Sequence, residues 1–479
     1  MSKDVSYARD DYTHSLSDWM LVDDVCEGAR QVKSKGEAYL PKPNPTDLSE
    51  DNNERYKQYV LRAQFFNATG RTLEGLTGTV FVKVPQLIVP TLMQYVDKDV
   101  NGQGLSIYQQ SQSALADTVK KGRIGLFVDY PPTQSSTTKK QQDEEGIRAT
   151  INTVSAKSVI NWRTQTFGAI TRLSLVVISE QIEVVGDDGF SSTFEPQYRV
   201  LALKGGMYFV QIWKERKKDQ GEGSEWYMET EYQPLNGKGK PWNEIPFIFI
   251  GAKNNDPAID KSPLLDLANV NIGHYRNSAD YEDSVYTVGQ PQAWMNGLDT
   301  EWRTFLEKQG IKIGSKALLM LPGNGQFGFA QVEPNTLSKE AMDQKEKQMA
   351  ELGARLVEKG GVVKTATEDE NDTEVEHSVL SLASSNVSEA YTQALQWVAE
   401  FMNTDGDIEY TLNQEFNKTK LDPQMLMALV GAWQQGTLPD ADLWTQYRKV
   451  GLIDPEKDDE TIREEVANSD NGLGLDDAA

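Results

Sequence analysis

Two groups of residues in this sequence have types and spacing that could support chemistry. Gly323, Gly325 and Gly328 form a G-x-G-x-x-G pattern, which in a dinucleotide-binding fold lets backbone N–H groups approach a pyrophosphate. That use requires a helix directly afterwards. Phe329–Val332 instead has the alternation of a strand, and Pro334 follows soon after. The glycines therefore favour a β-hairpin over a nucleotide site.

The second group is acidic. Asp280, Glu282 and Asp283 could hold Mg²⁺ in a nuclease, because carboxylates are ligands that this ion prefers. The chain contains 72 acidic residues, so clusters of this kind arise by chance. Its three histidines are too scattered in sequence to indicate a metal site; they are His14, His274 and His377. Walker A, H-E-x-x-H, G-x-S-x-G and C-x-x-C motifs are absent, so we expect no enzyme, no catalytic residue, no metal and no cofactor.

The net charge of −24 restricts how the protein could interact with nucleic acid. A protein that grips nucleic acid neutralises phosphates with basic residues, and this composition argues against that mode. It allows the reverse, a surface that repels phosphate so that a strand slides past, although such a charge also simply keeps proteins soluble. Basic residues are few, so their places matter: Lys345 lies on a predicted helix, and Lys359 and Lys364 flank the flexible pair Gly360-Gly361.

Cysteine use and hydropathy indicate a cytosol-like environment. Cys26 is the single cysteine, which excludes an intrachain disulfide framework and is typical of a reducing compartment. The first residues lack the basic and apolar regions of a signal peptide, and the longest apolar runs are far below the roughly 18 residues of a membrane span. We therefore expect no contact with a membrane.

The elements that would position these residues fall into blocks. At 479 residues the chain exceeds one core, so two or more packed units are expected. Residues 1–130 are predicted to be mainly helical, with a helix from Tyr56 to Phe66. The polar residues 131–146 indicate a mobile loop or a subdomain edge. From 150 to 250 the apolar period changes to two, which predicts an antiparallel sheet.

The block from Ser262 to Met402 has the clearest pattern. Ser262 as N-cap and Pro263 as first helical residue predict a helix to about Val288, roughly 36 Å long. Short strands around a small helix, Thr300–Lys308, follow. A second helix is predicted from Ser338, with the i,i+4 ion pairs Asp343–Lys347 and Glu351–Arg355 on its outer face. A third has the cleanest apolar stripe in the chain: Leu380, Ala383, Val387, Ala390, Ala394, Val398 and Phe401.

The order of these parts and several local phrases resemble the portal proteins of tailed bacteriophages, in particular the branch described by a domain of unknown function numbered 4055. The likeness covers nearly the whole chain. The phrases that carry it are Gly36–Pro41, Tyr56–Ala63 with Phe65–Asn67, Gly75–Gly78, Ile160–Arg163, Ile245-Pro246, Ser262–Leu264 and Met349–Arg355.

The resemblance implies an α+β portal fold with an α/β wing, a two-helix stem, a small α/β clip, a long kinked wing helix and a short helical crown. The implied segments are a wing (1–262), a first stem helix (263–288), a clip (289–334), a second stem helix (335–357), a tunnel loop (358–378), a long wing helix (379–403), a crown (404–467) and a disordered acidic tail (468–479).

The resemblance also implies a function. Portal subunits form a homododecameric ring at one capsid vertex of the virion, assembled in the host cytoplasm with the major capsid protein and scaffold. Double-stranded DNA passes through the ring during packaging and ejection, and the clip docks the terminase large subunit and later the head–tail adaptor. The expected DNA-facing residues are Lys359 and Lys364, then Lys345. The expected clip contacts are Trp294, Trp302, Arg303 and Phe327, whose aromatic members are equally consistent with a clip core.

Two other hypotheses stay open. One is a different structural virion component, such as a capsid or scaffold-like protein, which would form shells or fibres and would not need paired stem helices. The other is a metal-dependent nucleic-acid enzyme built on one of the acidic clusters.

Overall fold

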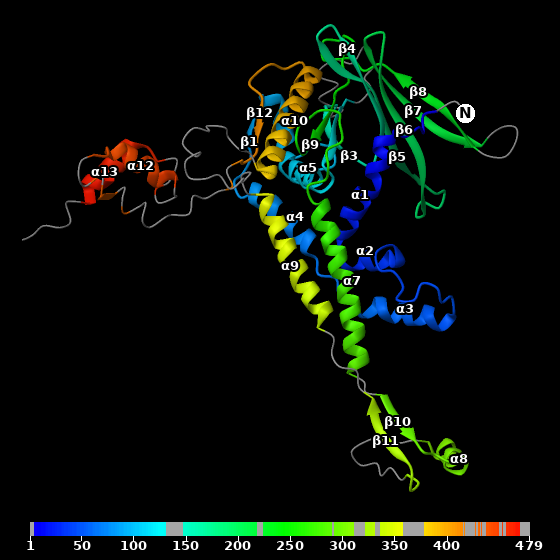
Figure 1. Ribbon diagram of the computed structural model, residues 1–479. Helices are drawn as coiled ribbons and strands as arrows, with labels where there is room; N and C mark the ends of the chain where they lie inside the picture. Colours follow the sequence, from blue (N-terminus) through cyan, green and yellow to red (C-terminus); the bar gives the residue numbers. More distant parts are fainter. Residues whose placement is uncertain are drawn as a thin grey trace, which may run out of the picture. The chain divides into compact units, whose positions relative to one another are not determined.

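The computed structural model describes residues 4–130, 147–217, 224–289, 292–310, 321–330, 336–357, 378–414, 416, 427, 430–431, 433, 437–449, 453 and 457–469. It divides the chain into two units, Met1–Asn413 and Gln414–Ala479. Helices and strands both contribute widely to the first unit, so the predicted α+β class is confirmed (Figure 1).

The N-terminal part is helical. Trp19, Val22 and Val25 of the first helix are all buried. The helix predicted from Tyr56 to Phe66 instead ends at Arg62, because Asn67 opens the next helix by accepting a hydrogen bond from the Gly70 N–H. The elements are α1 (Asp10–Glu27), α2 (Ala29–Ser34), the 3₁₀ helix η1 (Gly36–Ala38), α3 (Glu50–Arg62), α4 (Ala68–Val80), the 3₁₀ helix η2 (Thr91–Asp97) and α5 (Ile107–Lys121).

A three-stranded antiparallel sheet lies at the centre of the first unit, in the order β3 (Thr150–Ser155), β2 (Arg123–Asp129) and β9 (Phe247–Gly251). Strand β2 is buried from Arg123 to Val128. Gly122 makes the turn from α5 into β2 at φ 74°, and a Cβ there would lie 2.5 Å from the Asp260 carbonyl oxygen. Only glycine satisfies both conditions.

A second, larger sheet is a simple antiparallel meander. Its strands follow chain order: β4 (Val159–Phe167), β5 (Ile170–Val185), β6 (Ser192–Lys204), β7 (Met207–Lys217) and β8 (Ser224–Tyr232). The outer ends of β5 and β6 are exposed, so this hairpin extends past the residues that pack on the body (Figure 1). The predicted antiparallel sheet is therefore present, although β9 belongs to the central sheet and not to this one.

Helix α10 (Val379–Met402) is the core helix of the first unit. It packs on β2, β9, α5 and β12 (Glu409–Thr411), which in turn pairs with β1 (Gln86–Ile88). Every residue of its predicted apolar stripe is buried. Ser378 caps its first turn by accepting a hydrogen bond from the Ser381 N–H, and Asn403 ends it at φ 49°.

Between the sheets and α10 the chain makes a long excursion. Helix α7 (Leu265–Val288) runs out, and helix α9 (Leu337–Arg355) returns beside it (Figure 1). The segment that joins them contains β10 (Gln292–Asn296), α8 (Thr300–Gln309) and β11 (Gln326–Ala330). Ser262 does not cap α7, because its hydroxyl donates to the Lys120 carbonyl oxygen while Leu264 occupies the N-cap position.

The second unit contains α12 (Asp440–Lys449) and α13 (Asp459–Ser469). The predicted acidic tail from residue 468 is thus helical at its start, and residues 470–479 lie outside the described ranges. Asp458 stabilises the first turn of α13 by accepting a hydrogen bond from the Thr461 N–H, and Ile462 is buried. Acidic residues at a helix N-terminus are favourable, so a negative sequence does not prevent this helix. None of the helices in the described ranges is long and apolar enough to cross a membrane.

Candidate functional site

The site with the clearest construction is the outgoing helix α7, the returning helix α9 and the small β-unit between them. The inner end of α7 is fixed by a buried amide. The Asn271 side chain accepts hydrogen bonds from the N–H and hydroxyl of Thr69 and donates to the carbonyl oxygen of Phe66, at 3.1, 2.9 and 2.8 Å. These three bonds connect α7 to the start of α4, which sets the direction in which α7 leaves the body.

The outer half of α7 is held to α3 by the carboxylates of Asp280 and Asp283. Asp280 accepts a hydrogen bond from the Tyr59 hydroxyl at 2.5 Å, and Asp283 pairs with Arg62 at 2.7 Å. Arg55 lies 3.6 Å from the same Asp283 carboxylate. Burial, together with the Asp280 acceptor, raises the pKa of Tyr59. Two of the three acids considered as magnesium ligands, Asp280 and Asp283, therefore hold α3 against α7. Among the described residues no group of three or more His, Cys, Asp and Glu could hold a metal ion.

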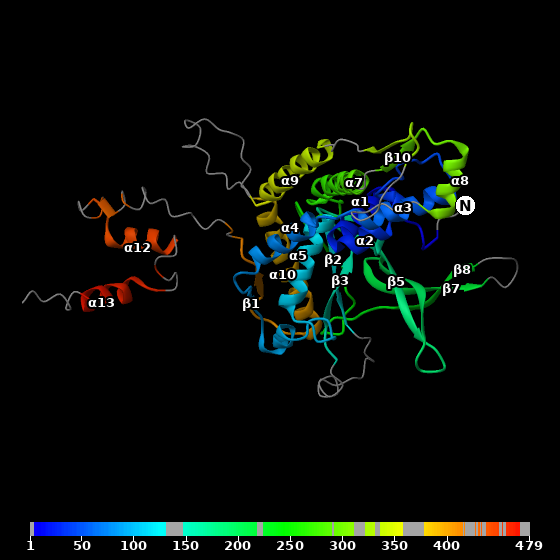
Figure 2. The same cartoon turned by 90° about the horizontal axis from the view of Figure 1, so that it is seen from below.

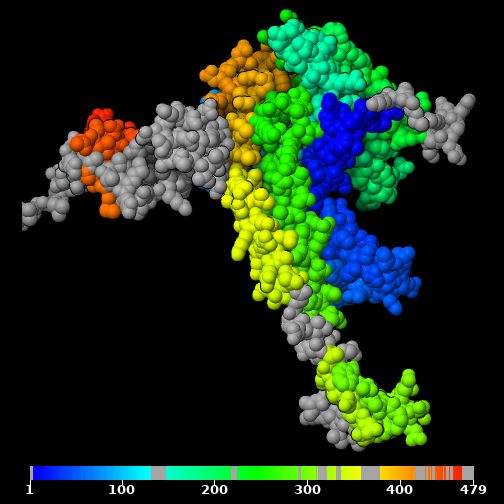
Figure 3. All heavy atoms as spheres, in the orientation of Figure 1, coloured from blue at the N-terminus to red at the C-terminus, as the bar shows by residue number. Residues whose placement is uncertain are grey.

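Helix α9 packs along α7, and Figure 3 shows the two in contact along their length. Met349 is the buried contact of α9. His274 is buried, with its Nε2 atom 3.3 Å from Oε1 of Glu346, while its Nδ1 atom has no partner in the described part of the chain. Lys345 lies with its aliphatic stem over Gly273, where an added Cβ would approach its Cε atom to 3.0 Å. Lys345 is thus half-buried in the helix pair.

The ion pairs predicted on the outer face of α9 form only in part. Arg355 pairs with Glu351 one turn earlier, as the i,i+4 spacing predicts. Lys347 makes no ion pair with Asp343 or with any other acid in the described ranges.

The β-unit consists of β10, α8 and β11 and is called the hairpin unit below. Strands β10 and β11 pair antiparallel, with Trp294 opposite Gly328 and Met295 opposite Phe327. A Cβ at Gly328 would lie 2.8 Å from Cζ2 of Trp294, so the glycine leaves room for the indole ring. The G-x-G-x-x-G pattern therefore serves a strand pair, as predicted, because its last glycine lies within β11 and not at the start of a helix.

Helix α8 supplies a second aromatic pair. Asp299 caps it by accepting a hydrogen bond from the Trp302 N–H at 2.8 Å, and the Trp302 and Phe305 rings meet edge to face at 5.6 Å. Arg303, on the outside, pairs with Glu307 one turn later at 3.2 Å. Asp299 and the i,i+4 pair are local features, so this helix forms as the sequence predicts.

Exposure separates the predicted docking residues. Trp294 is exposed, at 41%, whereas Trp302 and Phe327 are less exposed and lie half-buried within the hairpin unit. Two aromatic residues that the sequence did not single out are more exposed: Phe305 at 45% and Phe329 at 52%. Phe329 shares a strand face with Phe327, and their rings lie 5.1 Å apart. Strand alternation alone could have identified it.

The predicted DNA-facing lysines Lys359 and Lys364 lie outside the described residues. The two ends of the interval that contains them do meet, because the Leu380 N–H donates to the Leu356 carbonyl oxygen at 3.2 Å. The end of α9 and the start of α10 are therefore in contact.

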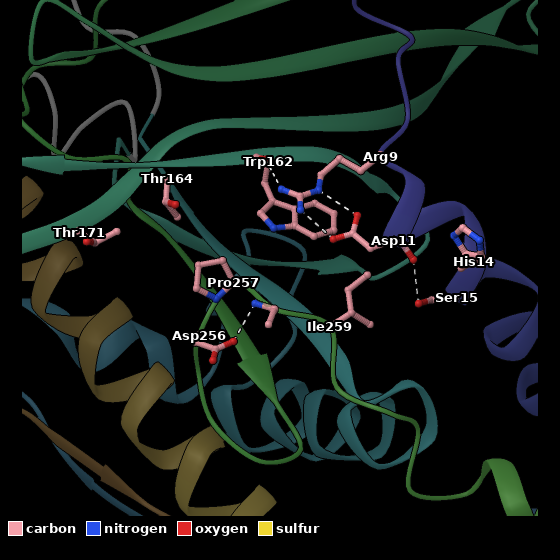
Figure 4. A pocket seen from close by; sticks show the side chains of 11 residues that line it. Arg9, Asp11, His14, Ser15, Trp162, Thr164, Thr171, Asp256, Pro257 and Ile259 are labelled. Carbon is pink, nitrogen blue, oxygen red and sulfur yellow. Dashed lines mark hydrogen bonds and ion pairs between the residues drawn. The ribbon is translucent and has the colours of Figure 1, made fainter.

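A pocket of about 860 Å³ lies elsewhere, between the start of α1, strand β4 and the 256–259 segment (Figure 4). Arg9 stacks on Trp162 with 4.4 Å from its guanidinium carbon to the ring centroid, and it forms a bidentate pair with Asp11. Behind Trp162, Arg123 lies 4.1 Å from the ring, and burial lowers its pKa to about 9. The Arg9–Asp11 pair neutralises itself. His14, Ser15 and Asp256 also line the pocket, but no group of three or more His, Cys, Asp and Glu residues in the described ranges could hold a metal ion.

Comparison with known proteins adds three findings. The family described as a domain of unknown function (DUF4055) matches residues 263–402, which span α7, the hairpin unit, α9 and α10. No protein with a curated description matches. Among solved structures, the chain is similar to one in the virion of a native gene transfer agent particle, with 15% identity, a TM-score of 0.38, and 87% of this chain and 97% of that chain covered. A chain in the neck of the native particle gives 13% identity and a TM-score of 0.37 over 79% of this chain and 89% of that chain.

Proposed function

We propose that this chain is the portal subunit of a tailed-bacteriophage-like particle. In this proposal twelve copies form a ring at one vertex of the capsid, and double-stranded DNA passes through the ring when the genome is packaged and ejected. The chain acts as channel and docking platform, without catalysis of its own.

The observation that carries the proposal is the excursion from α7 to α9. A portal needs a rod that leads from a broad body to a docking element, and a second rod that leads back. Here α7 and α9 form such a pair, the hairpin unit stands between them in sequence, and α10 returns the chain to the core. The DUF4055 match covers this same set of elements, 263–402. A shell or fibre protein would not require a paired excursion.

The hairpin unit is the proposed docking surface for the terminase large subunit and the head–tail adaptor. Its exposed aromatic side chains come from both strands and from α8, so an apolar contact is available on more than one side. Interfaces of this kind are enriched in aromatic and arginine side chains, and Trp294, Phe329 and Arg303 supply both.

The proposed channel is acidic, in keeping with a net charge of −24, because repulsion of phosphates keeps a moving duplex from sticking. Lys359 and Lys364 are the proposed basic contacts on either side of Gly360-Gly361. Lys345, whose stem lies in the α7–α9 contact, is a weaker candidate, since half of its side chain is occupied by packing.

The first experiment measures the mass of the purified chain by light scattering and images the same fraction in negative stain. Rings of about twelve copies with a central hole support the proposal. In parallel, the fraction is incubated with linear double-stranded DNA and Mg²⁺. A compact monomer or dimer that cleaves this DNA would overturn the proposal in favour of an enzyme, and shells or fibres would favour another virion component.

A further inference from the structure

The hairpin unit contains two of the five Asn-Gly pairs in the sequence: Asn296-Gly297 at the end of β10 and Asn324-Gly325 shortly before β11. Both asparagines are exposed. Figure 1 shows these strands beyond the outer ends of α7 and α9, and Figure 2, seen from below, shows β10 and α8 on that outer side. Solvent therefore reaches both pairs.

An Asn-Gly pair can undergo a reaction that needs no enzyme. The backbone nitrogen of the glycine attacks Cγ of the asparagine. A bond forms between these two atoms, the bond from Cγ to Nδ2 breaks, and Nδ2 leaves as ammonia with the proton that the backbone N–H gives up. Water then opens the resulting succinimide ring at either carbonyl group, which yields aspartate or isoaspartate. Glycine favours the attack because it has no Cβ to obstruct a close approach of the backbone.

Asn296-Gly297 is the pair in which the two reacting groups already meet. The Gly297 N–H donates a hydrogen bond to Oδ1 of Asn296 at 2.7 Å. Because Oδ1 is bonded to Cγ, the attacking nitrogen lies one covalent bond from the atom that it must reach. In the described part of the chain this N–H has no other partner. No contact with a third residue has to open before the attack.

Asn236-Gly237 has the opposite arrangement. The Gly237 N–H donates to the Glu400 carbonyl oxygen at 3.1 Å, and Nδ2 of Asn236 donates to Oε1 of the same glutamate at 3.1 Å. The side-chain oxygen of Asn236 accepts from the Lys238 N–H at 3.1 Å. Both reacting groups are thus held by other residues, so this pair is an internal control.

The remaining described pairs also lack the contact seen at Asn296. The Gly325 N–H is bonded within its own turn, to the Pro322 carbonyl oxygen at 2.8 Å. Oδ1 of Asn101 accepts from the Gln103 N–H at 3.0 Å, and not from its glycine neighbour. The fifth pair, Asn471-Gly472, lies outside the described residues. Within the described ranges, Asn296 is therefore the asparagine best placed for the reaction.

The position of Asn296 gives the reaction a consequence. Asn296 shares a face of the strand pair with Trp294, because residues two apart on a strand point the same way. Gln326 and Gly328 lie opposite them on this face, and none of the four is charged. Aspartate would add a carboxylate about 7 Å along the strand from Trp294. Isoaspartate would also lengthen the backbone by one atom where Asn296 pairs with Gln326.

We propose that Asn296 is a site of spontaneous deamidation, and that the product alters the face of the hairpin unit that carries Trp294. The reaction itself rests on the geometry of Asn296 and Gly297. Its effect on docking rests on the proposed function, which makes the hairpin unit the contact for the head–tail adaptor. Rings that wait without a partner would therefore lose the ability to dock with time.

The first test follows the reaction in the full wild-type chain. The purified protein is kept in warm, mildly alkaline buffer, which favours loss of the backbone proton, and its peptides are analysed by mass spectrometry for conversion of amide to acid. We expect Asn296 to react at least about fivefold faster than Asn236. The reason is that the Gly237 N–H must first leave Glu400, and one net hydrogen bond corresponds to about fivefold in rate.

Urea supplies the control for local sequence. In the unfolded chain the bonds to Glu400 are lost, so Asn296 and Asn236 should react at similar rates. A folded chain in which Asn296 reacts no faster than Asn236 would overturn the proposal. A difference that persists unchanged in urea would overturn it too, because the folded geometry would then not be its cause.

Two variants connect the reaction to docking. Asn296→Gln removes the reactive amide, because the longer side chain closes the ring poorly, and Asn324→Gln is the matched change at the other Asn-Gly turn of the unit. Adaptor binding is measured before and after ageing. Rings of the wild type and of Asn324→Gln should lose affinity in proportion to the deamidated fraction, whereas Asn296→Gln rings should keep theirs. Equal losses in all three would contradict the effect on docking.

The outcomes are distinct from those that test the ring. Selective reaction at Asn296 in a chain that forms no rings supports the modification and contradicts the portal proposal. Rings in which Asn296 does not react selectively contradict the modification and leave the portal proposal standing.

Discussion

Helix α10 and the hairpin unit differ in almost every physical respect, although both fall within the 263–402 match. The α10 stripe is buried against two sheets and α5, whereas no residue of the hairpin unit in the described ranges is fully buried. Burial of this kind stabilises a fold, while exposed aromatic residues on a small strand pair are available to a partner. The contrast teaches that one matched segment contains both the element that holds the body together and the element that we propose for docking.

The largest loss of stability is expected from a substitution in α10, and it would test the difference between this helix and exposed parts of the chain. Leu395 is fully buried, so Leu395→Ala should lower the free energy of unfolding by about 2–5 kcal/mol through lost burial and the cavity left behind. Leu337→Ala, at the exposed start of α9, is the matched control and should change it by less than about 0.5 kcal/mol. Urea unfolding followed by circular dichroism measures both. Equal losses of stability in the two variants would contradict the view that α10 stabilises the body through burial.

A second test concerns a buried charge in the body. Asp23 on α1 lies within 3.3 Å of Lys120, Lys121 and Lys157. Burial alone would raise its pKa, but these lysines hold the pKa below its ordinary value. The stability that Asp23 contributes is thus present above the pKa of the unfolded chain and lost as pH falls through the lower folded pKa.

The Asp23→Asn variant should therefore be less stable at pH 7, by up to about 3 kcal/mol, because a buried lysine loses a partner. Its stability should also fall less steeply than that of the wild type between about pH 5 and pH 2. Unfolding curves across this range measure both. Parallel pH profiles would show that the carboxylate plays no such part.

An intermediate effect is expected where α7 leaves the body. Asn271→Ala deletes three hydrogen bonds and leaves the Thr69 N–H and the Phe66 carbonyl group without their partner. We expect a loss of about 1–3 kcal/mol. Asn269→Ala is a neighbouring control, since that side chain is exposed and bonds only within α7. Hydrogen exchange of the α4 amides should increase in the first variant only.

Substitutions in the hairpin unit are expected to have the smallest effect on the free energy of unfolding. They are expected to have the largest effect on binding of a partner protein. Trp294→Ser should lower the free energy of unfolding by about 1 kcal/mol, because the indole packs on Gly328 while 41% of the side chain stays exposed. It should weaken binding of a head–tail adaptor to assembled rings at least about tenfold, if the indole is a central contact. Surface plasmon resonance on wild-type and variant rings compares the two, with Glu301→Gln as a control on the same unit. A variant that unfolds would assign Trp294 to the core of the unit.

Much of the local structure followed from local patterns. The α10 stripe predicted a buried helix because seven apolar residues at helical spacing have no other way to leave water together. The strands of the larger sheet followed from alternation and glycine turns. The predicted helix Thr300–Lys308 corresponds to α8, which a capping aspartate and an i,i+4 ion pair stabilise locally. In these places the signal lies within a few residues of the structure it determines.

Contacts distant in sequence could not be predicted in this way. Ser262 has the composition of an N-cap, yet its hydroxyl is taken by the carbonyl of Lys120, which a local pattern cannot reveal. Asp280 and Asp283 suggested metal ligands because their partners, Tyr59 and Arg62, lie more than two hundred residues away. The predicted DNA-facing and docking residues stay predictions, since their partners are other molecules.

The way the hairpin unit is attached also sets how the protein would respond to a pulling force. Both of its connections come from the same end of two antiparallel helices, so tension on the unit is shared between α7 and α9 along their axes. Axial tension pulls both helices in the same direction, so it loads the hydrogen bonds along each helix and the contacts that hold α7 to the body, and it does not peel one helix from the other. The body end is secured at two levels, by Asn271 inside and by the Tyr59–Asp280 and Arg62–Asp283 contacts further out. A tethered unit of this design can bear load before the core that contains α10 is disturbed.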